Sequence, residues 1–138
     1  MTARAIAVIL LTLASGPVLA QAAPVKSSTV AAAMPTPDDR ARQWLTLIDD
    51  GNFVQSWNEA APAFKKSHSA AAWTSQATAL RTPLGAVVSR DLKSVDLSRS
   101  RVAQVRYDTS FAHKSGAVET VTLAFGNGAW AVNGYSIK

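Results

Sequence analysis

The sequence contains no cysteine and only two histidines, His68 and His113. The absence of cysteine excludes disulfide bonds, thiolate nucleophiles, zinc fingers and iron–sulfur sites. The two histidines lie far apart in the sequence and belong to no HExxH motif, so we predict no metal site and expect both histidines in exposed loops. Glycine-rich phosphate loops, calcium loops and the Ser-x-x-Lys motif are also missing. The sequence therefore predicts no cofactor and no catalytic residue set.

The chain also lacks an apolar run of the roughly 20 residues that span a bilayer. Its N-terminus instead has a short basic stretch, Met1–Arg4, followed by the apolar run Ala5–Leu13 and by small residues at the positions that a signal peptidase reads. This pattern predicts a signal peptide over residues 1–22, cleaved after Ala20 or, as we favour, after Ala22. We expect the mature chain to be soluble in a bacterial periplasm or secreted, with no stable membrane insertion after the signal is removed.

Acidic residues are fewer than basic ones, 9 against 14, which gives a net charge of +5. The basic residues are spread along the chain and form no stripe with interleaved aromatic residues, so we predict no nucleic-acid partner. Weak attraction to anionic lipids or envelope polymers is the expected consequence of the positive charge. The 138 residues, 48% of them hydrophobic, provide for one packed domain.

After a flexible lead-in over residues 23–36, the pattern predicts this single domain over residues 37–138. Thr36 is placed to cap a helix that carries apolar residues at helical spacing from Ala41 to Ile48 and ends at Asp49–Asn52. A second helical stretch runs from Phe53 to Lys66, with Pro62 as a point where it kinks or divides. A third helix spans Ala70–Leu80 and stops at the Arg81–Gly85 turn.

From Gly85 onward the apolar residues recur at every second position, which indicates strands. The predicted strands are Val87–Leu97 with a bulge, 101–111, Ala117–Phe125 and Ala129–Ile137. Residues 113–116 are predicted to form the second turn and Gly126-Asn127-Gly128 the third. The predicted fold class is α+β, with the N-terminal helices packed on one face of a four-stranded antiparallel meander.

One acidic residue, Glu119, falls on the apolar side of its strand together with Val121. A buried carboxylate needs a cation or hydrogen-bond donors, and we expect these from Arg81, Arg90 or Tyr107. The four residues Arg81, Arg90, Tyr107 and Glu119 form either a structural ion pair, which we favour, or a ligand-binding site, or a catalytic pocket. We interpret Asp49 and Asp50 as a solvated turn.

Several motifs occur together and in order along nearly all of the predicted mature chain: Trp44–Asp49, Phe53, Ser56-Trp57, Phe64, Trp73, Arg81-Thr-Pro83-Leu-Gly85, Arg90, Tyr107–Phe111, Glu119–Val121, Trp130 and Gly134-Tyr135. In this pattern the chain resembles the uncharacterised domain-of-unknown-function family 4019. The segment 98–100 is shorter than the corresponding loop of the family, so no role of that loop is carried over. The resemblance implies a small exported bacterial domain without an assigned activity. The layout is also similar to nuclear-transport-factor-2-like and cystatin-like folds, a likeness that does not carry function.

Three functional hypotheses follow. The first is an exported non-catalytic module that binds a small ligand or a protein partner in the cell envelope. The second is a small enzyme that uses a polar pocket around Glu119, Arg90 and Tyr107. The third is a homodimeric structural envelope protein that uses the surface of its sheet.

Overall fold

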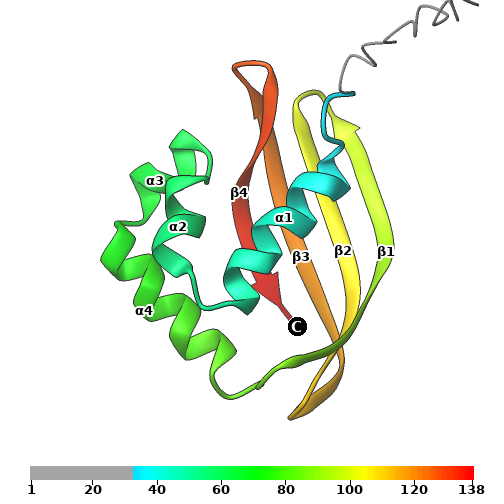
Figure 1. The fold of residues 1–138 in the computed structure, drawn as a ribbon. Helices are drawn as coiled ribbons and strands as arrows, with labels where there is room; N and C mark the ends of the chain where they lie inside the picture. Colours follow the sequence, from blue (N-terminus) through cyan, green and yellow to red (C-terminus); the bar gives the residue numbers. More distant parts are fainter. Residues whose placement is uncertain (1–32) are drawn as a thin grey trace, which may run out of the picture. The chain divides into compact units, whose positions relative to one another are not determined.

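The computed structural model describes residues 33–138. In this part of the chain, four helices precede four strands (Figure 1): α1 (Pro37–Asp49), α2 (Phe53–Asn58), α3 (Pro62–Ser67), α4 (Ala70–Arg81), β1 (Val87–Arg99), β2 (Val102–Phe111), β3 (Lys114–Gly126) and β4 (Ala129–Ile137). The predicted signal peptide, both predicted cleavage sites and most of the predicted lead-in lie outside the described residues. The domain boundaries proposed from the sequence stay a prediction.

Helix α1 begins at the predicted cap. The Thr36 side chain accepts a hydrogen bond from the backbone N–H of Asp39, and the Asp39 carboxylate accepts one in return from the Thr36 backbone N–H. These reciprocal bonds satisfy two backbone donors that the first turn of a helix would leave unpaired. The buried residues of α1 are Ala41, Trp44, Leu45 and Ile48, which confirms the predicted apolar stripe.

Pro62 divides the predicted second helix in two. It occupies the first turn of α3, where proline's missing N–H costs nothing, while Ala61 directly before it is extended. The backbone N–H of Ala61 donates to the Val132 carbonyl on β4, so the break also attaches the helices to the sheet. The domain therefore has four helices, because the proline starts a new helix and does not merely bend the old one.

The strands form one antiparallel sheet in the order β1-β2-β3-β4, and the helices lie on one face of it (Figure 1), as the sequence predicted. The β3–β4 turn places Asn127 and Gly128 at positive φ, which matches the predicted tight hairpin. The pairing of β1 with β2 shifts register at three points, so the predicted bulge is confirmed. One turn differs from the prediction: β3 begins at Lys114, since Gly116 adopts its positive φ within the strand and the turn consists of residues 112 and 113.

The core lies between the helices and the sheet and centres on a polar residue, Ser56, which is fully buried. The indole N–H of Trp44 donates to the Ser56 carbonyl at 2.9 Å, and the indole N–H of Trp73 donates to the Ser56 hydroxyl at 2.9 Å. Ser56 thereby joins α1, α2 and α4. Trp57 and Trp130 are only partly buried at the margin of this core.

Candidate functional site

The turn between α4 and β1 determines where the two candidate arginines lie. Gly85 adopts φ +75°, and an added Cβ would stand 2.7 Å from the ring of His113, so only glycine fits without displacing its neighbour. The carbonyls of Leu84 and Ala86 accept hydrogen bonds from the β2–β3 turn. With both sides of the turn held, Arg81 at the end of α4 and Arg90 on β1 project toward the same region.

Glu119 on β3 is fully buried and has all its hydrogen-bond acceptor positions filled. Its Oε2 accepts from Arg90 Nε at 2.6 Å and from the Thr109 hydroxyl at 2.9 Å. Its Oε1 accepts from Arg90 Nη2 at 3.1 Å and from the Tyr135 hydroxyl at 2.7 Å. A carboxylate offers about four lone-pair positions. None therefore remains for a further donor.

Asp49 at the end of α1 joins the same group of charges. The residue is exposed, as the predicted solvated turn implies, but its carboxylate is paired with Arg81 and Arg90, which that interpretation did not include. Its Oδ1 accepts from Arg81 Nη2 at 2.8 Å and from Arg90 Nη2 at 3.0 Å, and its Oδ2 accepts from Arg90 Nη1 at 2.7 Å. Burial alone would raise the pKa of Asp49, but the hydrogen bonds from Arg90 and Arg81 outweigh it and hold this pKa below its ordinary value. With three of about four acceptor positions used within residues 33–138, one position on Oδ2 is left for solvent or another donor.

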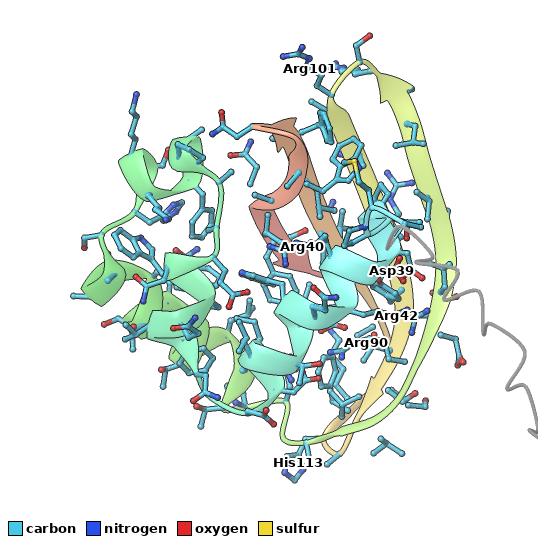
Figure 2. The ribbon with its side chains drawn as sticks, turned by 45° about the horizontal axis from the view of Figure 1, so that its top comes forward. Asp39, Arg40, Arg42, Arg90, Arg101 and His113 are labelled. Carbon is cyan, nitrogen blue, oxygen red and sulfur yellow. The ribbon has the colours of Figure 1, made fainter. Side chains whose placement is uncertain are left out.

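These four residues, Asp49, Arg81, Arg90 and Glu119, are called the charge cluster below. Two carboxylates and two guanidinium groups make it neutral, and it connects α1, α4, β1 and β3. Figure 2 shows Arg90 under α1, on the sheet face that the helices cover. Burial alone would lower the pKa of Arg90, but its bonds to Asp49 and Glu119 raise that pKa above its ordinary value, so the guanidinium stays charged.

Tyr107, the fourth residue of the predicted site, is held elsewhere. Its hydroxyl donates to Asp38 Oδ1 at 2.6 Å, near the start of α1. The sequence predicted that the Tyr107 hydroxyl would donate to Glu119. The hydroxyls of Tyr135 and Thr109 donate to Glu119 in its place. Burial, followed by the neighbouring Glu119 charge, raises the pKa of Tyr135, so this phenol remains a donor.

Arg81 is not fully satisfied within the described part of the chain. Its Nη2 bonds Asp49, whereas its buried Nε and Nη1 have no hydrogen-bond partner there. The Nη1 atom lies 4.0 Å from Glu119 Oε1, and the guanidinium carbon lies 5.0 Å from the centre of the Phe111 ring. Coulomb attraction and a cation–π contact therefore compensate part of the lost hydration.

A groove opens beside the charge cluster, between the end of α1, the start of α2, the end of α4 and the start of β1. It has a volume of about 590 Å³. Its lining includes the apolar residues Ile48, Phe53 and Val87, with Asp49 and Arg81 as the charged residues. A second hollow, of about 330 Å³, lies over the β1–β2 end of the sheet and has a mostly polar lining. Small-molecule sites combine an apolar wall with a few charged or polar groups, and the groove has both, which favours it over the second hollow.

The two histidines lie apart from this site. His113 is exposed at the β2–β3 turn, as predicted, and Figure 2 shows it at the opposite end of the sheet from Arg101. His68 is half-buried and not exposed, because its ring stacks on Phe64 with the ring centres 4.7 Å apart. Residues 33–138 contain no group of three metal-ligating side chains. No helix within this range is both long and apolar enough to cross a membrane.

Comparison with known families identifies the class of domain. Residues 40–135 match the model of the family described as protein of unknown function, DUF4019. This match covers the helices and the sheet that carry the charge cluster. The chain belongs to the DUF4019 family, as its sequence motifs predicted. No curated protein shows significant similarity to the chain.

Proposed function

We propose that this chain is a non-catalytic binding module of the bacterial cell envelope, and that it holds a small ligand in the groove between α1, α4 and β1. The observation that carries the proposal is the difference between the two carboxylates of the charge cluster. Among the described residues, Glu119 has all its acceptor positions filled, whereas Asp49 lines the groove and has one position on Oδ2 that none of these residues fills.

The charges around the groove favour a neutral ligand. A cationic ligand would approach the two guanidinium groups of Arg81 and Arg90, and an anionic ligand would approach the Asp49 carboxylate. A hydroxyl or amide donor meets neither repulsion and fits the open lone pair of Asp49. The groove's apolar wall favours an aliphatic or aromatic body. The inferred ligand class is therefore a small, largely apolar molecule with one neutral hydrogen-bond donor.

In this proposal the predicted site residues have separate roles. Arg81 and Arg90 orient the Asp49 carboxylate, and Glu119 positions Arg90 by accepting its hydrogen bonds. Tyr107 fixes the start of α1 by donating a hydrogen bond to Asp38. The enzyme hypothesis needs Glu119 and Tyr107 to act on one substrate, but the two side chains bond to different partners. This separation supports binding over catalysis.

The proposal is tested with matched six-carbon probes: hexanol and hexanamide as neutral donors, hexanoate and hexylammonium as charged molecules. Backbone amide chemical shifts report binding. We expect saturable shifts at Gly51 and Ala86 with the neutral probes and weaker shifts with both charged probes. Ala86→Trp fills the groove without altering the charge cluster and should abolish the shifts.

The matched control is Ala79→Trp, which adds the same side chain at an exposed position of α4. It should leave binding of the neutral probes unchanged. The proposal fails if neither neutral probe shifts the Gly51 and Ala86 amides, or if Ala86→Trp binds them as well as the unmodified chain does.

We also propose that the chain reaches the envelope by export. The basic and apolar segments of residues 1–22 support this step. Intact-mass measurement of protein extracted from the periplasm should place the first residue at Gln21 or Ala23. A product that retains Met1 contradicts export.

A further inference from the structure

Strand β1 has an apolar surface that the helices leave uncovered. Six large hydrophobic residues are exposed in the described part of the chain, and four of them, Val88, Leu92, Val95 and Leu97, lie on this strand. Leu92 pairs with Tyr107 and Val95 with Val105, two residues that are fully buried, so Leu92 and Val95 face the helix side of the sheet. Their own exposed fractions are 43% and 40%, so the helices of the described residues leave this part of β1 uncovered.

β1 is also an edge strand. It spans Val87–Arg99 and pairs only with β2 within the described residues (Figure 1), so its other side presents free backbone N–H and C=O groups. A long edge strand with exposed aliphatic side chains is a site where the strand of another chain can pair through backbone hydrogen bonds. The charged residues on its solvent side, with the bulge, oppose indiscriminate pairing, so the added strand must be a selected one.

The bulge indicates which strand fits. Arg90, Leu92 and Val95 face the helix side, since their partners on β2 are buried. Asp91, Ser94 and Asp96 face the solvent side, and Lys93, the extra residue of the bulge, joins them because its Nζ bonds Asp108. From Asp91 to Asp96 the side chains therefore point to the solvent side, the helix side, the solvent side, the solvent side, the helix side and the solvent side. This order of six is the same in both directions from the point between Lys93 and Ser94.

Residues directly opposite each other in an antiparallel ladder must lie on the same face of the sheet. In a regular strand the side chains alternate between the two faces without interruption. Such a strand could therefore place its side chains on the same faces as those of β1 on one side of the bulge only. A second β1 carries the same interruption and matches on both sides when the two-fold axis passes between Lys93 and Ser94. In that register Leu92 lies opposite Val95 of the other copy, apolar against apolar.

We propose that β1 is an interface for a second copy of this chain, paired antiparallel about the Lys93–Ser94 bulge into one eight-stranded sheet. This inference goes beyond the proposed function and does not depend on the groove. The paired segment is short, and the register brings Asp91 opposite Asp96 of the other copy. The dimer is therefore weak and depends on concentration.

The apolar contact is tested by analytical ultracentrifugation of protein extracted from the periplasm after expression of the full chain. The unmodified protein should pass from monomer to dimer between micromolar and millimolar concentration. Val95→Glu should raise the dimer dissociation constant at least about tenfold, since two carboxylates enter the interface. Val54→Glu is the matched control: Val54 is 55% exposed on α2, and its substitution should leave the constant unchanged.

The register is tested by reversing charge. Asp91→Lys replaces two like-charge contacts by two attractive ones and should tighten the dimer by about 3- to 10-fold. Asp91→Lys combined with Asp96→Lys restores repulsion and should remove this gain. A protein that stays monomeric throughout overturns the proposal, as does a dimer that Val95→Glu does not weaken. A dimer that Asp91→Lys fails to tighten overturns the proposed register.

Discussion

Glu119 is a charged side chain at a position that its strand otherwise fills with apolar residues. Removing a carboxylate from water costs several kcal/mol unless partners replace the lost hydration. Arg90, Thr109 and Tyr135 provide four short hydrogen bonds for this purpose. The fold therefore depends on keeping all of these partners in place.

Substitution of Glu119 by Gln should lower the free energy of unfolding by about 3–5 kcal/mol, because it leaves the Arg81 and Arg90 guanidinium groups with Asp49 as the one remaining carboxylate of the charge cluster. Arg90→Met should be similarly harmful. The double variant should lose clearly less than the sum of the two single losses. Urea denaturation measures all three, and Glu59→Gln, a half-buried carboxyl outside the charge cluster, should change stability by less than about 0.5 kcal/mol. Strict additivity in the double variant would contradict the ion pair.

Asp49 makes stability depend on pH in the acid range. Its pKa in the folded protein is lower than in the unfolded chain, so its ion pairs contribute fully above about pH 4. That contribution is lost as the pH falls through the folded-state pKa. The difference in unfolding free energy between the unmodified protein and Asp49→Asn should thus be constant at neutral pH and shrink in acid. A difference that grows below about pH 4 would show the opposite linkage.

At the scale of residues, the sequence predicts the burial of a side chain more reliably than it predicts the hydrogen-bond partners of that side chain. Strand alternation placed Glu119 on the helix side of the sheet, and Arg90 was among its expected partners. Alternation could not identify Tyr135, which lies on the neighbouring strand in a register that only the structure defines. Asp49 was missed because a helix end next to Gly51 resembles a solvated turn, and its partners are distant in sequence.

At the scale of elements, the turn at Gly85 decides whether α4 and β1 present their arginines to the same carboxylates. Gly85→Ala combines an unfavourable positive φ with a 2.7 Å approach to the His113 ring. Gly51→Ala is the matched control, because its φ is +74° and nothing lies within 4 Å of the added Cβ.

We expect Gly51→Ala to cost about 1 kcal/mol from backbone strain alone. Gly85→Ala should cost clearly more, and His113→Ala should recover part of the excess because it removes the ring that the new Cβ meets. Thermal unfolding of the variants measures these differences. Equal losses for the two glycine substitutions would contradict the close packing at Gly85.

The elements themselves were predictable where local chemistry defines them. The Thr36 cap, the stripe of α1 and the Asn127-Gly128 turn each follow from neighbouring residues. The β2–β3 turn was misplaced because glycine is typical both of turns and of bulges, and Gly116 takes its positive φ inside β3. Whether Pro62 would bend or divide the helix was open, since the hydrogen bond between Ala61 and Val132 spans the two ends of the domain.

At the scale of the whole molecule, strand β1 is common to three features of the described residues: the charge cluster, the groove and the exposed edge. The charge cluster joins the ends of α1 and α4 to β1 and β3, the groove opens beside it, and β1 continues past the helices as an exposed edge. The groove and the outer half of β1 use different residues. The proposed ligand binding and the proposed self-association are therefore separable by substitution.

In the proposed function Asp49, and not Glu119, is the acceptor that meets the ligand. The most direct test is a crystal structure of the protein purified without refolding from the envelope of the bacterium that makes it. We expect ligand density in the groove against Ile48, Phe53 and Val87, with a donor atom within hydrogen-bonding distance of Asp49 Oδ2 and with the Arg90–Glu119 bonds intact. An empty groove, or a ligand bonded to Glu119 with Arg90 displaced, would contradict the claim.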